Sequence, residues 1–182
     1  MDVELEGVRR IDLTPHRDDR GALTELFRES WFQGGHRFVQ ANLSVSRAGV
    51  LRGLHFHRHQ ADLWVVLAGV ALVGLHDLRP GSPTEDRSAS VWMNQPVEGE
   101  AALYIPPGVG HGLAAVEDVT LLYLVDVEFT GEDEFGVAWD DPALGIDWPI
   151  REPILSDRDR SNPALDKAKG DAPLFSTGEE PA

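Results

Sequence analysis

The feature that most constrains this chain is a series of short β-rich runs separated by turn residues at intervals of roughly 8–12 residues. Turn signals include RDDRG (17–21), RPGSPT (79–84) and PPGVG (106–110), and few stretches show a helical period. Such spacing is typical of a β-sandwich or β-barrel. The run 63–78 should be two strands around Gly69. Strands are predicted at 7–13, 22–28, 38–46, 50–57, 63–78, 88–94, 101–106, 111–116 and 120–129.

The rest of the chain offers fewer elements. WFQGGH (31–36) is expected to end one helical turn, and DDPALGIDWP (140–149) to form an ordered loop because its tryptophan and isoleucine should be buried. From Asp166 onwards the composition is polar and rich in small residues, which predicts a frayed or partner-dependent tail. We therefore expect one domain over residues 1–165 and a polar tail over 166–182.

Composition limits the possible partners. The 182 residues carry 31 acidic and 16 basic side chains, a net charge of −15, which argues against a nucleic-acid-binding or membrane-coating protein. An anionic ligand would need a few local arginines. No apolar run reaches the roughly 18 residues of a membrane span, and the acidic N-terminus lacks the apolar core of a signal peptide, so we expect a cytoplasmic protein. The absence of cysteine excludes disulfides and thiol chemistry.

The stretch GVLRGLHFHRHQADLWVVLAG (49–69) gathers side chains that carry chemistry. His55 and His57 lie two apart, so on a strand both face the same way. Asp62 follows, and PPGVGH later brings His111. Three histidines and a carboxylate suit Fe, Mn, Ni or Zn, but a histidine beside a carboxylate also suits proton transfer. Both interpretations stay open on this pattern alone.

The spacing of these residues resembles the two motifs of the cupins, which are small β-barrels. The usual glutamate of the first motif is aspartate here, and the polar residue that normally ends the second is Ala115. The resemblance implies an all-β fold, a cupin or jelly-roll barrel of antiparallel sheets with minor helix. The matching positions are Gly49, His55, His57, Asp62 and Gly69, then Pro106, Gly108 and His111.

A longer stretch, from about Asp18 to Asp159, resembles one branch of the cupins, the dTDP-4-dehydrorhamnose 3,5-epimerase family. This resemblance implies an isomerase that acts on a dTDP-linked 4-keto-6-deoxy sugar at C3, C5 or both, without a metal cofactor. It also implies a homodimer in which an N-terminal segment pairs with the partner's sheet. The matching segments are DDRG (18–21), FVQANLSVSRAGVLRGLHF (38–56), DLRPGSPT (77–84), IPPGVGHGL (105–113), WDDPALGIDWP (139–149) and LSDRD (155–159).

The family's reaction removes a proton beside a ketone and returns one from the opposite face, so a base and an acid must flank the ring. The resemblance assigns the base to His55, its carboxylate partner to Asp159 and the acid to Tyr123. The aspartate would fix the histidine tautomer and stabilise the imidazolium. Expected substrate contacts are Arg20, Glu25, Gln40, Asn42, Arg52, His57, Asp62, Asp77 and His111, with Arg20 and Glu25 in the neighbouring subunit's site.

Two of these assignments carry open alternatives. Asp77 is expected to point into the barrel, but it could instead form a structural salt bridge with Arg52 or Arg79. Trp64 could line a wall on which the base or the sugar stacks.

The chain departs from the family at the place of a lysine that lies near the developing enolate. Asp62 stands there, and the only lysines are Lys167 and Lys169 in the tail. A second tyrosine is also replaced, by Phe129. An ionised aspartate would repel an enolate unless a proton or a cation neutralised it.

Three explanations of this departure remain. Arg52 or a protonated histidine could stabilise the enolate, the site could be retuned to one carbon or another sugar, or a metal ion could replace the lysine's charge. Beside the epimerase, two alternative functions stay open. One is a non-catalytic nucleotide-sugar-binding cupin, and the other is a metal-dependent cupin enzyme that uses His55, His57, Asp62 and His111.

Overall fold

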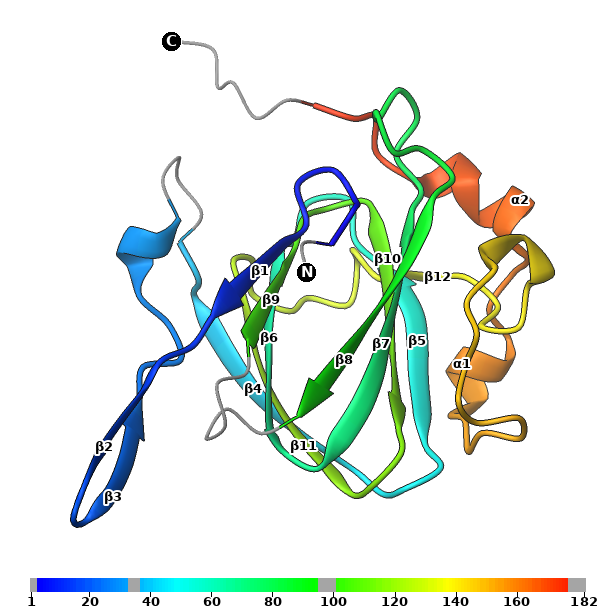
Figure 1. The fold of residues 1–182 in the computed structure, drawn as a ribbon. Coiled ribbons are helices and arrows are strands. Elements are labelled where there is room, and N and C mark those ends of the chain that lie inside the picture. The colour runs from blue at the N-terminus through cyan, green and yellow to red at the C-terminus, as the bar shows by residue number, and fades with distance from the viewer. Residues whose placement is uncertain (1–2, 33–36, 95–100, 177–182) are drawn as a thin grey trace, which may run out of the picture.

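The computed structural model describes residues 3–32, 37–94 and 101–176, and within them two five-stranded sheets face each other (Figure 1). Every ladder between named strands is antiparallel, which confirms the predicted all-β cupin-like fold. The first sheet contains, in order, β1 (Arg9–Asp12), β9 (Ala101–Ile105), β6 (Asp62–Ala68), β11 (Val119–Val125) and β4 (Gln40–Ser46). The second contains β12 (Phe135–Gly136), β5 (Leu51–Phe56), β10 (Val109–Ala115), β7 (Val70–Asp77) and β8 (Ser88–Asn94).

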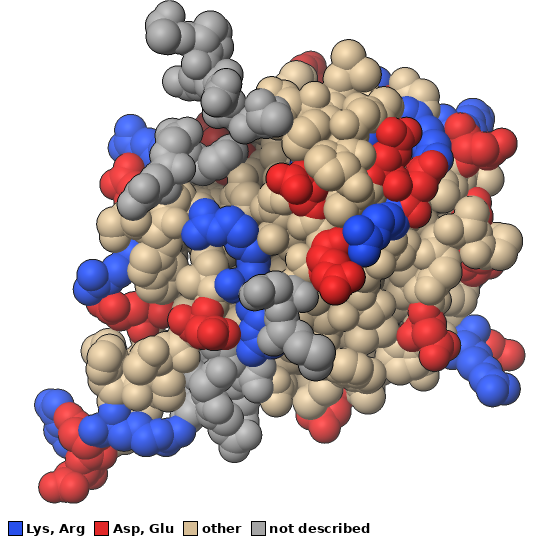
Figure 2. All heavy atoms as spheres, turned by 45° about the horizontal axis from the view of Figure 1, so that its top comes forward, with Lys and Arg blue, Asp and Glu red and all other residues tan. Residues whose placement is uncertain are grey.

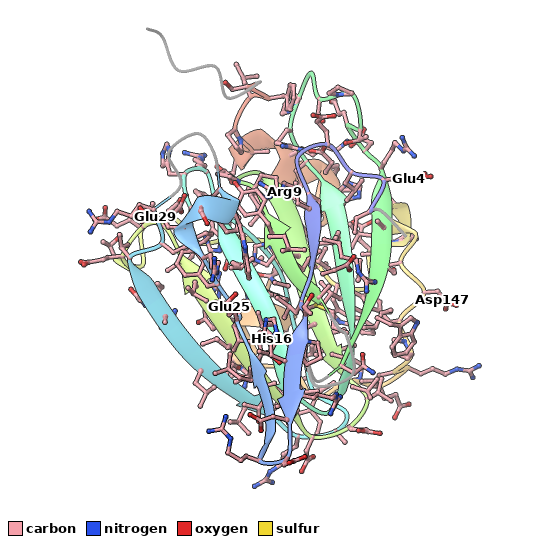
Figure 3. All side chains as sticks on the ribbon, turned by 60° about the vertical axis from the view of Figure 1, so that its left-hand side comes forward. Glu4, Arg9, His16, Glu25, Glu29 and Asp147 are labelled. Carbon is pink, nitrogen blue, oxygen red and sulfur yellow. The ribbon has the colours of Figure 1, made fainter. Side chains whose placement is uncertain are left out.

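The remaining elements lie outside the two sheets. A hairpin arm, formed by β2 (Pro15–Asp18) and β3 (Gly21–Thr24), projects from the body (Figure 1). Figure 3 views the molecule from the side of this arm and labels His16 and Glu25. In the described part of the chain, the helices are too short to cross a membrane. They are η1 (Glu29–Trp31), η3 (Pro142–Leu144), α1 (Asp157–Arg160), α2 (Leu165–Ala168) and η4 (Lys169–Asp171).

The predicted break at Gly69 is confirmed. This residue has φ +81°, and a Cβ there would lie 2.1 Å from the carbonyl oxygen of Asp118, so only glycine fits between β6 and β7. Two predicted strands extend too far, since β3 ends at Thr24 and β11 at Val125. The hairpin strand β2 and the two-residue β12 were not predicted. The polar run of β2 pairs only with β3 and has no buried face to produce an alternating pattern.

Apolar side chains pack on both faces of each sheet. Between the sheets, side chains such as Val73 and Leu103 form the main core. Phe27, Trp31, Phe32 and Phe38 pack on the outside of the first sheet, where Phe27 and Phe32 stack at 6.0 Å between ring centroids. The loop 140–149 packs on the second sheet, where its Ile146 and Trp148 are partly buried rather than fully buried as expected. The expected turn at 31–36 is only partly described, because residues 33–36 lie outside the described residues.

The chain after Asp166 differs from the frayed tail that was expected. Leu165 and Ala168 are buried against Leu54 and Phe56, and the backbone NH of Phe175 donates to the carbonyl of Pro80 at 3.1 Å. Because α2 is only four residues long, its apolar face is too short to produce a recognisable helical period. The last part of the predicted tail, 177–182, lies outside the described residues.

The face that Figure 2 shows carries charges of both signs. On this face, acidic and basic side chains are interspersed among uncharged ones. The notable apolar surface lies instead on β4, the edge strand of the first sheet, where Leu43 and Val45 are each 64% exposed. An exposed apolar edge strand is a surface on which another strand can pair.

Candidate active site

A cavity of about 470 Å³ lies between the two sheets. Its walls come from five strands, β4, β5, β6, β10 and β11, and its rim from the segment that leads into α1. The strands supply polar side chains on their inner faces, where a continuous core would need apolar ones. The cavity is lined by Gln40, Asn42, Ser44, Arg52, His55, His57, Gln60, Asp62, Trp64, His111, Leu113, Leu121, Tyr123, Val125, Phe129, Glu134, Ser156, Arg158 and Asp159.

A register shift in β5 brings two of these residues to the same wall. His55 is opposite His111 and Arg52 is opposite Leu113, so β5 has one more residue in this interval than β10. Such a bulge resets the alternation of side chains, and Arg52 and His55 both reach the cavity although they are three apart. Gly53 occupies the bulge with φ +110°, and a Cβ there would lie 2.6 Å from the carbonyl oxygen of His111. The glycine of LRGLH is therefore required by the backbone.

His55 and Asp159 form the predicted pair. His55 Nε2 lies 2.6 Å from Asp159 Oδ1, and the two side chains are 25% and 5% exposed. Because a carboxylate only accepts hydrogen bonds, Nε2 carries the proton and the neutral ring keeps its lone pair on Nδ1. Burial alone would raise the pKa of Asp159, but the hydrogen bond and charge of His55, with bonds from Ser156 and Gly53, hold that pKa below its ordinary value.

Local structure fixes this aspartate in place. Ser156 caps the one-turn helix α1 by accepting a hydrogen bond from the backbone NH of Asp159 at 3.1 Å. The motif SDRD thus folds so that its last residue turns inwards, while Asp157 in the same turn stays exposed. An ionised, buried carboxylate behind an imidazole is the arrangement that a histidine base requires.

Tyr123 lies on β11, where it is paired with Trp64 of β6 on one side and Asn42 of β4 on the other. Burial, and then the negative charge of Asp62, raise the pKa of Tyr123. The phenol therefore keeps its proton at neutral pH and can donate it. Tyr123 and His55 come from different sheets and line the same cavity.

The floor of the cavity is a compact cluster of His57, Asp62 and His111. All three are buried, and one ligand atom from each lies within 4.8 Å of the others. His57 Nε2 is 3.9 Å from Asp62 Oδ2. The ring of Trp64 meets the ring of His111 edge-on at 5.1 Å, so this tryptophan forms one side of the floor.

Hydrogen bonds fix the tautomers of the two histidines in this cluster. The Nδ1–H of His57 donates to the carbonyl of Asp133 at 2.5 Å, and that of His111 donates to the carbonyl of Val109 at 2.9 Å. Each neutral ring therefore has its lone pair on Nε2. Burial, with the charge of His57, lowers the pKa of His111 well below its ordinary value, which keeps this ring neutral.

Asp62 is held by uncharged donors. It accepts hydrogen bonds from Gln60 Nε2 at 3.1 Å and from Trp64 Nε1 at 3.3 Å. Burial raises the pKa of Asp62, although the charge of His57 and these two hydrogen bonds oppose the rise. The sequence departure at this position has thus produced a carboxyl group at the cavity floor.

Three further predicted contacts line the cavity. Gln40 Nε2 donates to Asn42 Oδ1 at 2.9 Å, and Gln40 Oε1 accepts from the backbone NH of Phe129 at 3.0 Å. Arg52 Nε donates a hydrogen bond to Ser46 Oγ at 2.8 Å. Because this hydroxyl is uncharged, the bond does not neutralise the positive charge of Arg52. The β4 wall therefore offers amide groups, and β5 offers a cation.

Two predicted contacts lie outside the cavity of this single chain. Arg20 and Glu25 belong to the arm region, where Arg20 pairs with Asp18 and Glu25 pairs with Arg28. Figure 3 shows Glu25 on this side of the molecule. Their expected role in a neighbouring subunit's site stays a prediction.

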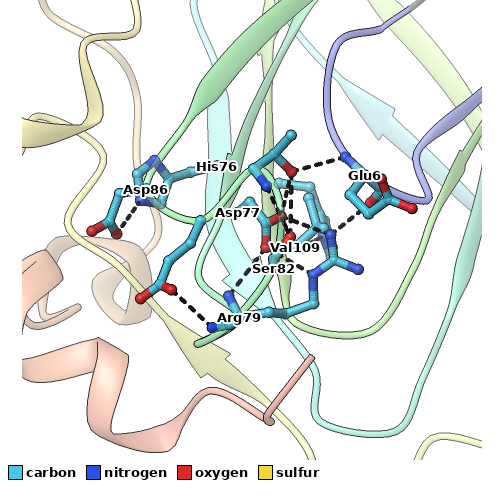
Figure 4. A network of polar contacts seen from close by, with 11 residues as sticks. Glu6, His76, Asp77, Arg79, Ser82, Asp86 and Val109 are labelled. Carbon is cyan, nitrogen blue, oxygen red and sulfur yellow. Dashed lines mark hydrogen bonds and ion pairs between the residues drawn. The ribbon is translucent and has the colours of Figure 1, made fainter. Parts of the chain in front are cut away.

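Asp77 follows Val73 and Leu75 on the inner face of β7, but it is not among the residues that line the cavity, so the prediction that it contacts the substrate is wrong. Asp77 is fully buried at the end of β7, where Arg79, Ser82 and Thr84 all donate to its carboxylate (Figure 4). The turn after β7 folds back over its own strand end, so the structural salt bridge with Arg79 prevails. Burial raises the pKa of Asp77, but these hydrogen bonds outweigh it and hold that pKa below its usual range.

Sequence reasoning missed an ion pair at the rim of the cavity. Arg158 Nη1 lies 2.7 Å from Glu134 Oε2, and both residues line the cavity.

The neighbouring Asp133 holds the loop after β5, since its carboxylate accepts hydrogen bonds from the backbone NH groups of Arg58 and His59 at 2.7 and 2.9 Å. Arg158 lies within the recognised SDRD motif, but nothing in the local pattern of 131–134 points to the cavity.

Comparison with known proteins identifies close relatives. A sequence profile of dTDP-4-dehydrorhamnose 3,5-epimerases matches residues 2–167. The enzyme of that name from Mycobacterium tuberculosis is 34% identical over 179 residues, which cover 92% of this chain and 88% of the relative.

Two solved structures are also similar. A 3'-monoepimerase from Streptomyces bikiniensis in complex with dTDP-quinovose has a TM-score of 0.87 at 36% identity. The match covers 95% of this chain and 92% of the chain in that structure. An epimerase from Legionella pneumophila in complex with dTDP-4-keto-L-rhamnose has a TM-score of 0.89 at 30% identity, with 97% and 98% covered.

Proposed function

The chain belongs to the dTDP-4-dehydrorhamnose 3,5-epimerase family, and from this premise we propose that it epimerises a dTDP-linked 4-keto-6-deoxyhexose at C3, at C5 or at both. The observation that carries the proposal is the buried His55–Asp159 pair, which lines the same cavity as Tyr123. A base and an acid on different sheets can act on opposite faces of a sugar ring between them.

In the first step, His55 removes a proton from the carbon beside the ketone. The C–H electron pair forms a double bond to C4, and the carbonyl π electrons move to the C4 oxygen, which gives an enolate. The proton passes to the free nitrogen of His55. Asp159 stabilises the imidazolium that forms, and its hydrogen bond to Nε2 leaves Nδ1 as the nitrogen that accepts the proton. The low pKa of Asp159 keeps this carboxylate charged at neutral pH.

In the second step, the Tyr123 phenol returns a proton to the carbon from the other face, which inverts that centre. Its raised pKa keeps the phenol protonated until the enolate requires the proton. Arg52, which lines the same wall as His55, offers positive charge to the oxygen or to the diphosphate of the nucleotide. The amide groups of Gln40 and Asn42 can hold the nucleotide.

We propose further that the chain works as a homodimer in which the arm pairs with the edge strand β4 of the partner. An isolated hairpin such as β2–β3 is marginally stable, and its Leu23 is 64% exposed. β4 is an edge strand with two exposed apolar side chains, Leu43 and Val45. Because β4 also lines the cavity, this pairing would bring Arg20 and Glu25 near the partner's active site.

Solvent deuterium exchange tests the activity. The purified protein is incubated in D₂O with dTDP-4-keto-6-deoxyglucose, and proton NMR follows the signals at C3 and C5. We expect enzyme-dependent loss of the signal at one or both positions. Exchange at C3 alone would indicate a site retuned to one carbon, as the replacement of an expected tyrosine by Phe129 suggests. Absence of exchange above the protein-free background at both positions would remove the proposal.

A further inference from the structure

We propose that His57, Asp62 and His111 bind one divalent transition-metal ion at the floor of the cavity. The role of this ion in catalysis rests on the proposed epimerase activity, whereas its binding does not. The ion would supply positive charge at the position of Asp62, where the family resemblance implies a lysine.

The geometry of the three side chains is close to that of a metal site. Two imidazoles and one carboxylate form a common ligand set for Fe, Zn, Ni or Co. In a tetrahedral site with metal–ligand bonds of about 2.0–2.1 Å, ligand atoms lie roughly 3.4 Å apart. Here the three atoms lie within 4.8 Å of one another, and the His57–Asp62 pair is at 3.9 Å. Small side-chain rotations therefore suffice to enclose an ion.

The histidines are oriented as metal ligands are. A metal-bound histidine donates its second ring NH to a carbonyl or carboxylate, which fixes the tautomer and directs the other nitrogen at the ion. His57 makes this bond to the carbonyl of Asp133 and His111 makes it to the carbonyl of Val109. Two buried rings, one on β10 and one in the loop after β5, are thus held beside Asp62 with their Nδ1 atoms occupied.

The charge of the cluster also favours a cation. Asp62 is 3% exposed, and it accepts hydrogen bonds from the uncharged donors Gln60 and Trp64. Among the described residues, its only ion-pair partner is His57, at the long distance of 3.9 Å. A buried carboxylate without a close cation is costly, and a divalent ion would remove that cost. A protonated Asp62 in a metal-free cluster is the competing explanation.

The site would leave the proposed base free. The Nε2 of His55 is engaged with Asp159, so His55 is separate from the three ligands. His111 is nevertheless the direct cross-strand neighbour of His55, so the ion would lie one strand away from the base. When His55 takes the proton, the electron pair moves to the C4 oxygen, whose negative charge the ion would stabilise. This step requires no oxidant or reductant.

Direct metal binding is the test. Protein without a histidine tag is stripped with a chelator, then titrated with Co²⁺ while its visible absorption is recorded, and dialysed against Zn²⁺ for elemental analysis. We expect about one ion per chain, and a Co²⁺ spectrum of mixed nitrogen and oxygen ligation. Asp62→Asn and His111→Gln should each weaken binding by more than about 100-fold, since each removes a ligand.

Matched controls separate this site from its neighbours. His59→Gln removes an exposed histidine two residues from His57 and should leave metal binding and activity unchanged. His55→Gln should retain the ion and lose deuterium exchange. Should Asp62→Asn fail to fold, nitrogen NMR of the wild-type histidines still decides, because Zn²⁺ should shift the Nε2 signals of His57 and His111 and spare that of His59.

The possible failures are distinguishable. Exchange activity in stripped protein that binds less than about 0.2 ion per chain would overturn the metal site and leave the epimerase in place. Stoichiometric binding without exchange would support the site and remove the proposed function. Equal loss of binding in His59→Gln and Asp62→Asn would show adventitious surface binding, and would also overturn the inference.

Discussion

Replacing Asp159 with asparagine removes the charge behind the proposed base and keeps the shape of the side chain. In the wild-type site, the His55–Asp159 hydrogen bond is 2.6 Å long and the aspartate is 5% exposed. When His55 becomes an imidazolium, two opposite charges about 4 Å apart at an effective dielectric of about 20 attract each other by about 4 kcal/mol. At 1.36 kcal/mol per tenfold in rate, the loss corresponds to roughly 10³-fold.

The asparagine can also favour the wrong tautomer of His55 by presenting its NH₂ group to Nε2. We therefore expect kcat for deuterium exchange to fall by about 10²–10⁴-fold in Asp159→Asn. The binding of dTDP should change little, since Asp159 contacts the base and not the nucleotide in this account. Single-turnover NMR exchange, with dTDP binding measured by calorimetry, separates the two effects.

Asp157→Asn is the matched control. It makes the same chemical change in the same helical turn, but its side chain is exposed and lies outside the cavity lining. Its exchange rate should stay within about threefold of the wild type, because exposed charges contribute little. If Asp159→Asn also stays within threefold, or if both variants fall alike, the base assignment is refuted.

Four further predictions concern other parts of the fold. Tyr123→Phe should lower epimer formation by about 10²–10⁴-fold and leave dTDP affinity nearly unchanged, as product NMR and calorimetry would show. Gly53→Ala should destabilise the fold by about 1–3 kcal/mol in urea unfolding, because of its positive φ and the 2.6 Å approach to a carbonyl. Asp77→Asn should cost about 3–5 kcal/mol at pH 7. Because the folded pKa of Asp77 is lowered, its contribution is present above the unfolded pKa of about 3.9 and is lost as the pH falls through the folded pKa, so this variant's urea stability should fall less on acidification. Leu43→Lys should shift the mass measured by light scattering from dimer to monomer, and an unchanged mass would argue against pairing at β4.

The barrel itself could be predicted from sequence because its strands alternate and its turns carry strong signals. On β4, Gln40 and Asn42 face the cavity and Leu43 faces outwards, which is the period of two that defines a strand. Gly69 marked the break between β6 and β7 because only glycine fits there. Short or one-sided elements carry no such pattern, so β2, β12 and α2 were missed.

The parts of the site that lie in recognisable sequence motifs could be predicted. The segments LRGLH and SDRD are separated by about a hundred residues in sequence, yet the structure joins His55 to Asp159 across that gap. Alternation could not reveal the partners of Asp77, because its three side-chain donors come from the turn that follows β7. The contacts of Asp133 with the loop after β5 depend on tertiary packing, so no local pattern could indicate them.

The most direct test of the central claim is positional deuterium content in the product, measured by NMR for the wild type and for His55→Gln in parallel. The account predicts deuterium at C3, C5 or both together with inversion at each labelled centre for the wild type. It predicts a loss of both by at least about 10²-fold in the variant, with dTDP still bound. Wild-type labelling that persists unchanged in His55→Gln would contradict the account.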